Sequence, residues 1–182
     1  MQKETKKVLY SQIIKIIIMR KISSILFLML FAFISCTEIH DNVVISKNFT
    51  NHEWGRFEYL KGSLDIKKAP QEYDIIMEIV VDDIYPNPYE AHQTECFLPF
   101  NLTIKNPDDN GKRSKDYRFM LKDKDGNWKA EEKNGLYTFK LPVIEEMTFS
   151  EKGTYNFVIE NKYSKDPLYG IKSMTLKCIK SK

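Results

Sequence analysis

Alternation of apolar and polar residues is the feature that most narrows the folds open to this 182-residue chain. Side chains on a β-strand point to opposite faces in turn, so a period of two marks a strand with one buried face. The clearest runs span residues 73–81, 96–104, 117–121, 155–159 and 174–178, and weaker ones span 54–60 and 136–141. Turn residues separate the runs, and no sustained helical period follows residue 36. The sequence predicts about eight short strands.

Strands that each bury one face need a second packed layer. We therefore expect an all-β fold, a single β-sandwich of the immunoglobulin-like or jelly-roll-like kind, over residues 54–182. Tyr155 follows the turn at 150–153 and precedes Phe157 by two residues. That position is found for the tyrosine corner of immunoglobulin-type domains, but a core tyrosine at the start of a strand is the simpler interpretation.

The N-terminal region has the order of parts of an export signal. Met19-Arg20-Lys21 is followed, after three residues, by ten apolar residues from Ile25 to Ile34, and then by Ser35-Cys36. The apolar run is shorter than the roughly 18–20 residues that cross a bilayer. This order resembles the bacterial lipoprotein signal peptide, which implies cleavage before Cys36 and a diacylglycerol on its sulfur. The alternatives are an uncleaved membrane anchor and a buried strand.

This signal predicts the organisation of the whole chain. Residues 1–18 are a start-site extension, 19–35 the signal peptide, 36–53 a polar tether, and 54–182 the sandwich. The predicted protein is held at a membrane of the cell envelope by the lipid on Cys36, while its domain stays in water. No Asp follows Cys36 directly, and this favours the outer membrane. Whether the domain faces the periplasm or the cell surface stays open.

The distribution of charge argues against a nucleic-acid partner. The chain has 28 Lys and Arg against 25 Asp and Glu, a formal charge of +3. Six of the basic residues and one acid lie in residues 1–35, which leaves 22 basic and 24 acidic residues in 36–182, a net −2. A domain with that charge lacks the electrostatic basis for binding phosphate backbones.

No group of residues predicts catalysis, a metal site or a cofactor other than the lipid. Asp123, Asp125 and Gly126 faintly resemble a calcium loop, but the spacing is wrong and a hairpin turn is the simpler interpretation. The histidines are dispersed in predicted loops, at His40, His52 and His92. Adjacent carboxylates on a strand point to opposite faces, so they make poor acid–base pairs. We expect the protein not to be an enzyme.

The cysteines and exposed aromatic residues leave alternatives open. Cys96 and Cys178 fall on the apolar faces of their strands, where they either form a disulfide or are small buried hydrophobic residues. Trp128 follows the Asp125-Gly126 turn and either packs at the sandwich edge or offers a flat surface to a ligand. The segment 84–90 has two prolines and two tyrosines, which suits partner contact or a crossover between sheets. The candidate contact residues are Trp54, Tyr85, Tyr89 and Trp128.

The order of several motifs resembles one family. The signal peptide is followed by Trp54-Gly55-Arg56-Phe57, Tyr85-Pro86, residues 99–104, Asp125-Gly126-Asn127-Trp128, Gly153-Thr154-Tyr155-Asn156-Phe157 and Tyr169-Gly170-Ile171. This resembles the gliding-motility lipoprotein GldH family of Bacteroidetes over most of residues 36–182. The resemblance implies an envelope lipoprotein linked to the gliding machinery, with no catalytic residues.

Three functions follow from these observations. The first is a non-enzymatic accessory or structural component that binds other envelope proteins. The second is a surface lipoprotein whose sandwich binds glycans on exposed aromatic rings. The third is an enzyme, which the absence of a convergent titratable set disfavours. The sequence gives no indication of a small-molecule ligand.

Overall fold

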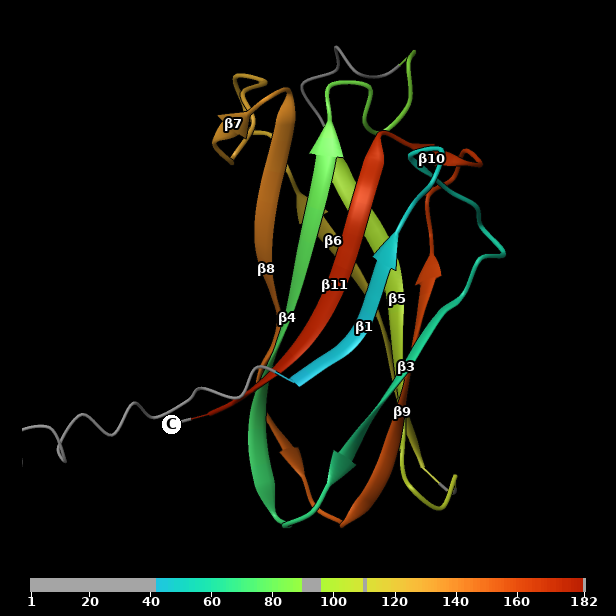
Figure 1. Cartoon of the computed structure of the whole chain (residues 1–182), viewed down its shortest axis with the longest axis vertical. Coiled ribbons are helices and arrows are strands. Elements are labelled where there is room, and N and C mark those ends of the chain that lie inside the picture. The colour runs from blue at the N-terminus through green and yellow to red at the C-terminus, as the bar shows by residue number, and fades with distance from the viewer. Residues whose placement is uncertain (1–41, 90–95, 110, 182) are drawn as a thin grey trace, which may run out of the picture. The chain divides into compact units, whose positions relative to one another are not determined.

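The computed structural model describes residues 42–89, 96–109 and 111–181, and these contain eleven strands and no helix (Figure 1). Within that part of the chain, nothing helical is long and apolar enough to cross a membrane. Eight strands have seven residues or more: β1 (Asn42–Asn48), β3 (Leu60–Ile66), β4 (Gln71–Asp82), β5 (Phe97–Lys105), β6 (Lys112–Met120), β8 (Leu136–Phe149), β9 (Gly153–Asn161) and β11 (Ile171–Lys180). Three have two residues: β2 (Glu53–Trp54), β7 (Glu132–Lys133) and β10 (Leu168–Tyr169).

The long strands form two antiparallel layers. A five-stranded sheet has the order β1-β11-β4-β8-β7, and a four-stranded sheet has the order β3-β9-β5-β6. The short pair β10-β2 lies at the end of the domain where β4 finishes and β11 begins (Figure 1). Figure 1 shows one layer in front of the other, so the predicted all-β sandwich is confirmed.

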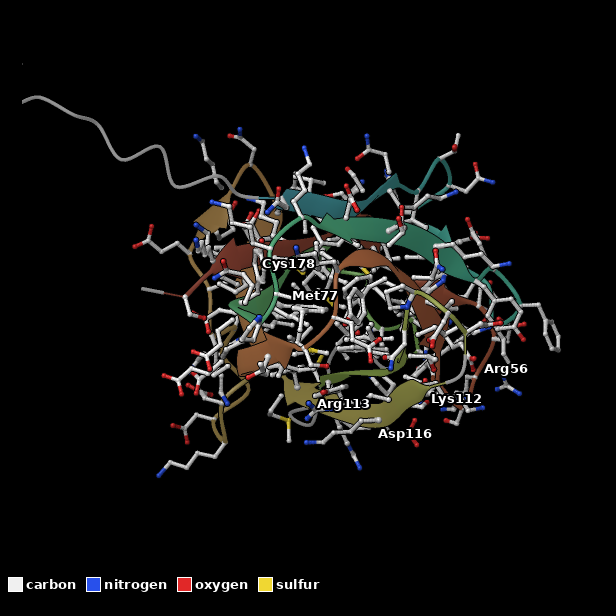
Figure 2. The ribbon with its side chains drawn as sticks, turned by 90° about the horizontal axis from the view of Figure 1, so that it is seen from below. Arg56, Met77, Lys112, Arg113, Asp116 and Cys178 are labelled. Carbon is white, nitrogen blue, oxygen red and sulfur yellow. The ribbon has the colours of Figure 1, made fainter. Side chains whose placement is uncertain are left out.

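The core lies between the two sheets and follows the alternation of the sequence. In β4 every second side chain from Ile75 to Val81 is fully buried, and β5 buries its alternate residues from Leu98 to Ile104. Met77 and Cys178 illustrate the same layer, pointing into the interior in the view of Figure 2. Burial of this apolar surface is the main term that stabilises such a domain.

The predicted tether at 36–53 is wrong from Asn42 onward. Residues 42–48 form β1, which pairs with β11 along its whole length, and Glu53–Trp54 form β2. A bulge between Val43 and Ile45 shifts the register of β1. Because of it, the adjacent residues Val44 and Ile45 are both buried, which removes the period of two that would reveal the strand. The domain includes Asn42 and does not begin at Trp54.

The predicted strand at 54–60 is also wrong. β2 ends at Trp54, residues 55–59 form a loop, and β3 starts at Leu60. Predicted strands in the rest of the chain lie within observed ones, with two exceptions: the run at 96–104 begins one residue before β5, and the run at 117–121 extends one residue past β6.

Tyr155 has the hydrogen bonds of a tyrosine corner. Its ring is buried, and its hydroxyl donates to the Glu151 carbonyl at 3.3 Å and accepts from the Glu151 N–H at 3.2 Å. A tyrosine corner bonds in this way to backbone a few residues upstream. Tyr155 is therefore both a core residue near the start of β9 and a residue with the hydrogen bonds of a tyrosine corner.

Candidate functional site

The four predicted contact residues do not form one surface. Trp54 and Tyr85 are 0% exposed, so the prediction that they contact a ligand or a partner is wrong. Trp128 is half-buried, and Tyr89 is 94% exposed. A planar set of exposed rings, which the glycan-binding hypothesis requires, does not exist among these four.

Trp128 packs at the edge of the sandwich. Its ring stacks on Tyr137 with centroids 4.6 Å apart, and Lys122 Nζ lies 4.6 Å from the ring. The ring therefore packs against neighbouring side chains, in agreement with the packing interpretation.

The turn before Trp128 is the predicted hairpin. Lys122 and Trp128 pair across it, and Asp123 Oδ1 accepts the N–H groups of Asp125 and Asn127, both at 2.9 Å. The hydrogen bond from the Asn127 N–H makes the largest contribution to lowering the pKa of Asp123. No set of His, Cys, Asp and Glu suited to a metal ion exists in the described ranges, 42–89, 96–109 and 111–181.

The proline-containing segment is a structural crossover for most of its length. It leads from β4 in one sheet toward β5 in the other, and the Tyr85 hydroxyl donates to the Phe97 carbonyl at 3.1 Å. Burial raises the pKa of Tyr85 well above its ordinary value, so the hydroxyl stays protonated as a donor. The buried Asn87 side chain donates to the Tyr163 hydroxyl at 2.5 Å. Beyond this anchored part Pro88 and Tyr89 are exposed, Tyr89 to 94%, next to residues 90–95, which lie outside the described ranges.

Trp54 supports the five-residue loop Gly55–Tyr59, called here the aromatic loop. The Trp54 indole N–H donates to the Glu58 carbonyl at 2.8 Å, across the loop. The Trp54 carbonyl in turn accepts from the buried side chain of Asn161 at 2.7 Å. Because indole and amide are both buried, the start of the loop is fixed to the end of β9.

Arg56 fastens the aromatic loop to the connection between β9 and β10. Its backbone N–H donates to Asp166 Oδ1 at 2.7 Å. Its guanidinium donates to the carbonyls of Tyr163 at 3.0 Å and Ser164 at 2.7 Å. Figure 2 shows Arg56 at one extremity of the domain. Several directional hydrogen bonds therefore hold a loop that contains no strand pairing of its own.

The aromatic loop presents two aromatic side chains to solvent. Phe57 is 78% exposed and Tyr59 is 47% exposed. Two hollows flank the loop, of about 290 Å³ and about 360 Å³. Each contains an ion pair: Lys47 and Glu58 at 2.5 Å in the first, and Lys162 and Glu160 at 2.9 Å in the second. An exposed aromatic ring that is flanked by both positively and negatively charged side chains suits contact with a protein surface.

Sequence reasoning missed Phe57 and Tyr59 because they fell inside a predicted strand. A signal against that strand was available. The large apolar residues there, at 54, 57, 59 and 60, fit no period of two.

Of the two alternatives for Cys96 and Cys178, the structure has the small buried residues and not the disulfide. Cys96 and Cys178 are both buried thiols. Cys178 pairs with Ile75 near the start of β4, whereas Cys96 precedes Phe97, which bonds to Tyr85 just after β4 ends. The length of β4 separates the two by about 20 Å, far beyond the ~7 Å that a disulfide spans. Burial raises the pKa of Cys178 to about 12, so it is an unreactive core residue.

His52 lies at the surface in a small charged group. Lys172 Nζ is 2.6 Å from His52 Nδ1 and 3.3 Å from the Asp82 carboxylate. The other two histidines, His40 and His92, and the lipidation residue Cys36 lie outside the described ranges.

Comparison with known proteins decides the family. The model for the GldH lipoprotein family matches residues 43–178, well over half of the chain. The chain belongs to the GldH lipoprotein family. As a GldH lipoprotein it is attached to a membrane of the cell envelope. The match also starts within β1, so the family region includes the strand that the sequence analysis assigned to a tether.

Other comparisons add nothing about ligands. No curated protein matches the chain. Similar solved structures include a family GH115 4-O-methyl-α-glucuronidase with specificity for decorated arabinogalactans (11% identity, 75% of this chain, 16% of that one, TM-score 0.37). An uncharacterized protein of Listeria monocytogenes (10%, 78%, 11%, 0.27) and a family 29 carbohydrate-binding module (10%, 78%, 90%, 0.28) are also similar. The chain spans only 16% and 11% of the first two, and scores this low carry no argument.

Proposed function

We propose that this GldH lipoprotein is a non-enzymatic accessory component of the cell envelope that binds another envelope protein through its aromatic loop. A lipid on Cys36 anchors it in the outer membrane, and the sandwich is the binding module. Its partners are proteins, with no nucleic acid and no cofactor beyond the lipid.

The observation that carries this proposal is the 78% exposure of Phe57 on a loop held by hydrogen bonds. Burying a phenylalanine side chain contributes roughly 1.5–3 kcal/mol to an association. Ordering a flexible loop would consume part of that free energy, but the bonds of Trp54 and Arg56 order this loop in advance. Aromatic side chains on rigid supports are typical centres of protein–protein interfaces.

The position of the aromatic loop favours a protein over the bilayer itself. Asn42 pairs with Cys178, whose other partner Ile75 is near the start of β4. Trp54 pairs with Leu168, close to Ile171, which pairs near the end of β4. The loop and the first strand therefore begin at opposite ends of the sandwich. The six residue steps from Cys36 to Asn42 reach at most about 20 Å, so a lipid on Cys36 would hold the other end near the membrane.

Site-specific photo-crosslinking in living cells tests the proposal. A photo-reactive amino acid replaces Phe57 in one strain and Lys152 in another, because Lys152 is an exposed residue in the turn between β8 and β9. Irradiation is expected to join position 57, and not position 152, to one or a few envelope proteins identified by mass spectrometry. The same adducts from both positions, lipid adducts alone, or none from position 57 would contradict protein binding through the aromatic loop.

A further inference from the structure

Strand β6 forms an open edge of the four-stranded sheet. It pairs with β5 through nine residues in unbroken register, from Phe97 opposite Met120 to Lys105 opposite Lys112. No strand pairs with its other side in the described part of the chain. A regular edge of this length is a template for an added strand.

The other edge strands are irregular or are packed against another strand. β8 contains Pro142, which has no N–H, its register with β4 shifts twice, and Glu146 has a positive φ of 52°. β1 carries the bulge next to Val44. β3 lies against β1 so closely that a Cβ at Gly62 would meet the Val44 carbonyl. Irregularities of this kind prevent strand addition, and β6 has neither a proline nor a bulge.

The register shows which backbone groups β6 offers. The Leu121 N–H donates to the Cys96 carbonyl at 2.8 Å, so this pair and every second pair along β6 exchange hydrogen bonds with β5. The residues between them point their N–H and C=O groups to the open edge. These residues are Lys112, Ser114, Asp116, Arg118 and Met120.

The charge of β6 indicates what kind of strand would fit. Four of its nine residues are cationic and one is acidic, a net +3 in a region, 36–182, whose total is −2. The cations occupy both faces: Lys112 and Arg118 share one, and Arg113 and Lys115 share the other. Figure 2 shows Lys112, Arg113 and Asp116 at the margin of the domain. Two β6 edges would repel each other, whereas a strand with alternate carboxylates would be attracted.

Contacts with β5 order the edge before any partner arrives. The Asn101 side chain donates to Asp116 at 2.7 Å, and the hydroxyls of Ser114 and Thr103 are 2.9 Å apart. Arg118 lies 3.4 Å from the centre of the Phe97 ring. A strand that is already straight and ordered loses little conformational entropy when a partner pairs with it.

We propose that β6 accepts an extended, acidic segment of a partner protein as a fifth strand of the four-stranded sheet. Backbone hydrogen bonds to the open edge supply the affinity, and the four cations select Asp- or Glu-rich segments. This site is separate from the aromatic loop.

Peptide binding to the full mature lipoprotein in detergent tests this proposal. The probe is a fluorescent peptide of nine residues, the length of β6, with Glu at alternate positions. The control peptide has Lys in place of each Glu. We expect the acidic peptide alone to bind, and its affinity to fall about tenfold as salt rises from about 0.05 to about 0.5 M. Equal binding of both peptides, or binding of neither, would overturn the proposal.

Substitutions at Ser114 separate strand pairing from simple charge attraction. Ser114→Pro removes one N–H from the open edge, where proline is tolerated, and should weaken the acidic peptide about tenfold. Ser114→Ala keeps the N–H and loses the hydroxyl contact with Thr103, so it should bind the acidic peptide clearly more tightly than Ser114→Pro does. If Ser114→Pro binds equally well, pairing at the edge is excluded.

A second variant guards against misfolding of Ser114→Pro. Lys112→Glu combined with Arg118→Glu leaves the backbone intact. This double variant should bind the basic peptide more tightly than the acidic one. An unchanged preference would contradict charge selection. A dimer of the unaltered protein that Ser114→Pro dissociates would identify a second copy as the occupant and overturn the acidic-partner proposal. Ser114→Pro should keep crosslinking at position 57, and Phe57→Ala should keep peptide binding, so the two proposals fail independently.

Discussion

Trp54 is buried, yet it determines how an exposed side chain is held. Its indole N–H bonds to the Glu58 carbonyl, one residue beyond Phe57, and its own carbonyl is bonded by Asn161. The buried residue that sequence reasoning treated as a contact is therefore a support for the contact. Phe57 is the exposed residue that can contact a partner, and the buried Trp54 holds the loop that carries it.

Replacing Trp54 by Phe should destabilise the domain by about 2–4 kcal/mol, because the hydrogen bond to the Glu58 carbonyl is lost and the smaller phenyl ring leaves a cavity where the buried indole was. Urea unfolding measures the change. Phe57→Ala is the control and should stay within about 0.5 kcal/mol of the unaltered protein, since its side chain is mostly in solvent. The support role of Trp54 is wrong if Trp54→Phe is as stable as the control.

Asp123 should make the stability of the domain depend on pH in acid. Its carboxylate accepts backbone N–H groups, chiefly that of Asn127, so its folded pKa lies below the ordinary 3.8. A carboxyl with a lowered folded pKa stabilises the fold above its unfolded pKa and loses that effect as pH falls through the folded value. The Tm difference between the unaltered protein and Asp123→Ala should be constant near neutral pH and narrow below about pH 4. A gap that stays unchanged in acid would contradict this.

At the scale of elements, β1 and β3 close one side of the sandwich. They belong to different sheets, and Gly62 of β3 faces the Val44 carbonyl of β1 without room for a Cβ. On the opposite side, β6 and β8 make at most slight contact in the described residues. The two sides of the sandwich therefore have different roles: one is sealed by packing, and the other leaves β6 open.

Gly62→Ala should destabilise the domain by about 1–3 kcal/mol, because the added methyl group forces β1 and β3 apart. Gly55→Ala is the matched control, since a Cβ there meets nothing within 4 Å. Thermal or urea unfolding of both variants measures the difference. Equal stabilities would show that β1 and β3 can separate without cost.

At the scale of the whole molecule, β1 should decide where the folding unit begins. A fragment from Asp41 to Lys182 should unfold cooperatively, and a fragment that starts at Trp54 should not. The shorter fragment loses Val44 and Ile45 from the core, each contributing roughly 1.5–3 kcal/mol, and exposes the edge of β11. Circular dichroism during heating distinguishes the two. A cooperative transition in the shorter fragment would restore the tether interpretation of residues 42–53.

Alternation predicted the strands whose inward residues are all apolar, such as β4, β5 and β11. It missed β1, where a bulge turns two adjacent residues inward, and the first half of β6, where Arg113 and Lys115 occupy inward positions. Alternation of apolar and polar residues could not predict the aromatic loop. A period reports which residues can share a face, whereas the exposure of Phe57 depends on hydrogen bonds to residues more than a hundred positions away.

The intact mass of the protein purified from its native cells tests the central claim, that this domain is carried on a lipid anchor. The account predicts the mass of residues 36–182 plus acyl chains and a glyceryl group on Cys36. A mass that retains residues 19–35, or one with Cys36 unmodified, would contradict the lipid anchor and remove the argument that places the aromatic loop away from the membrane.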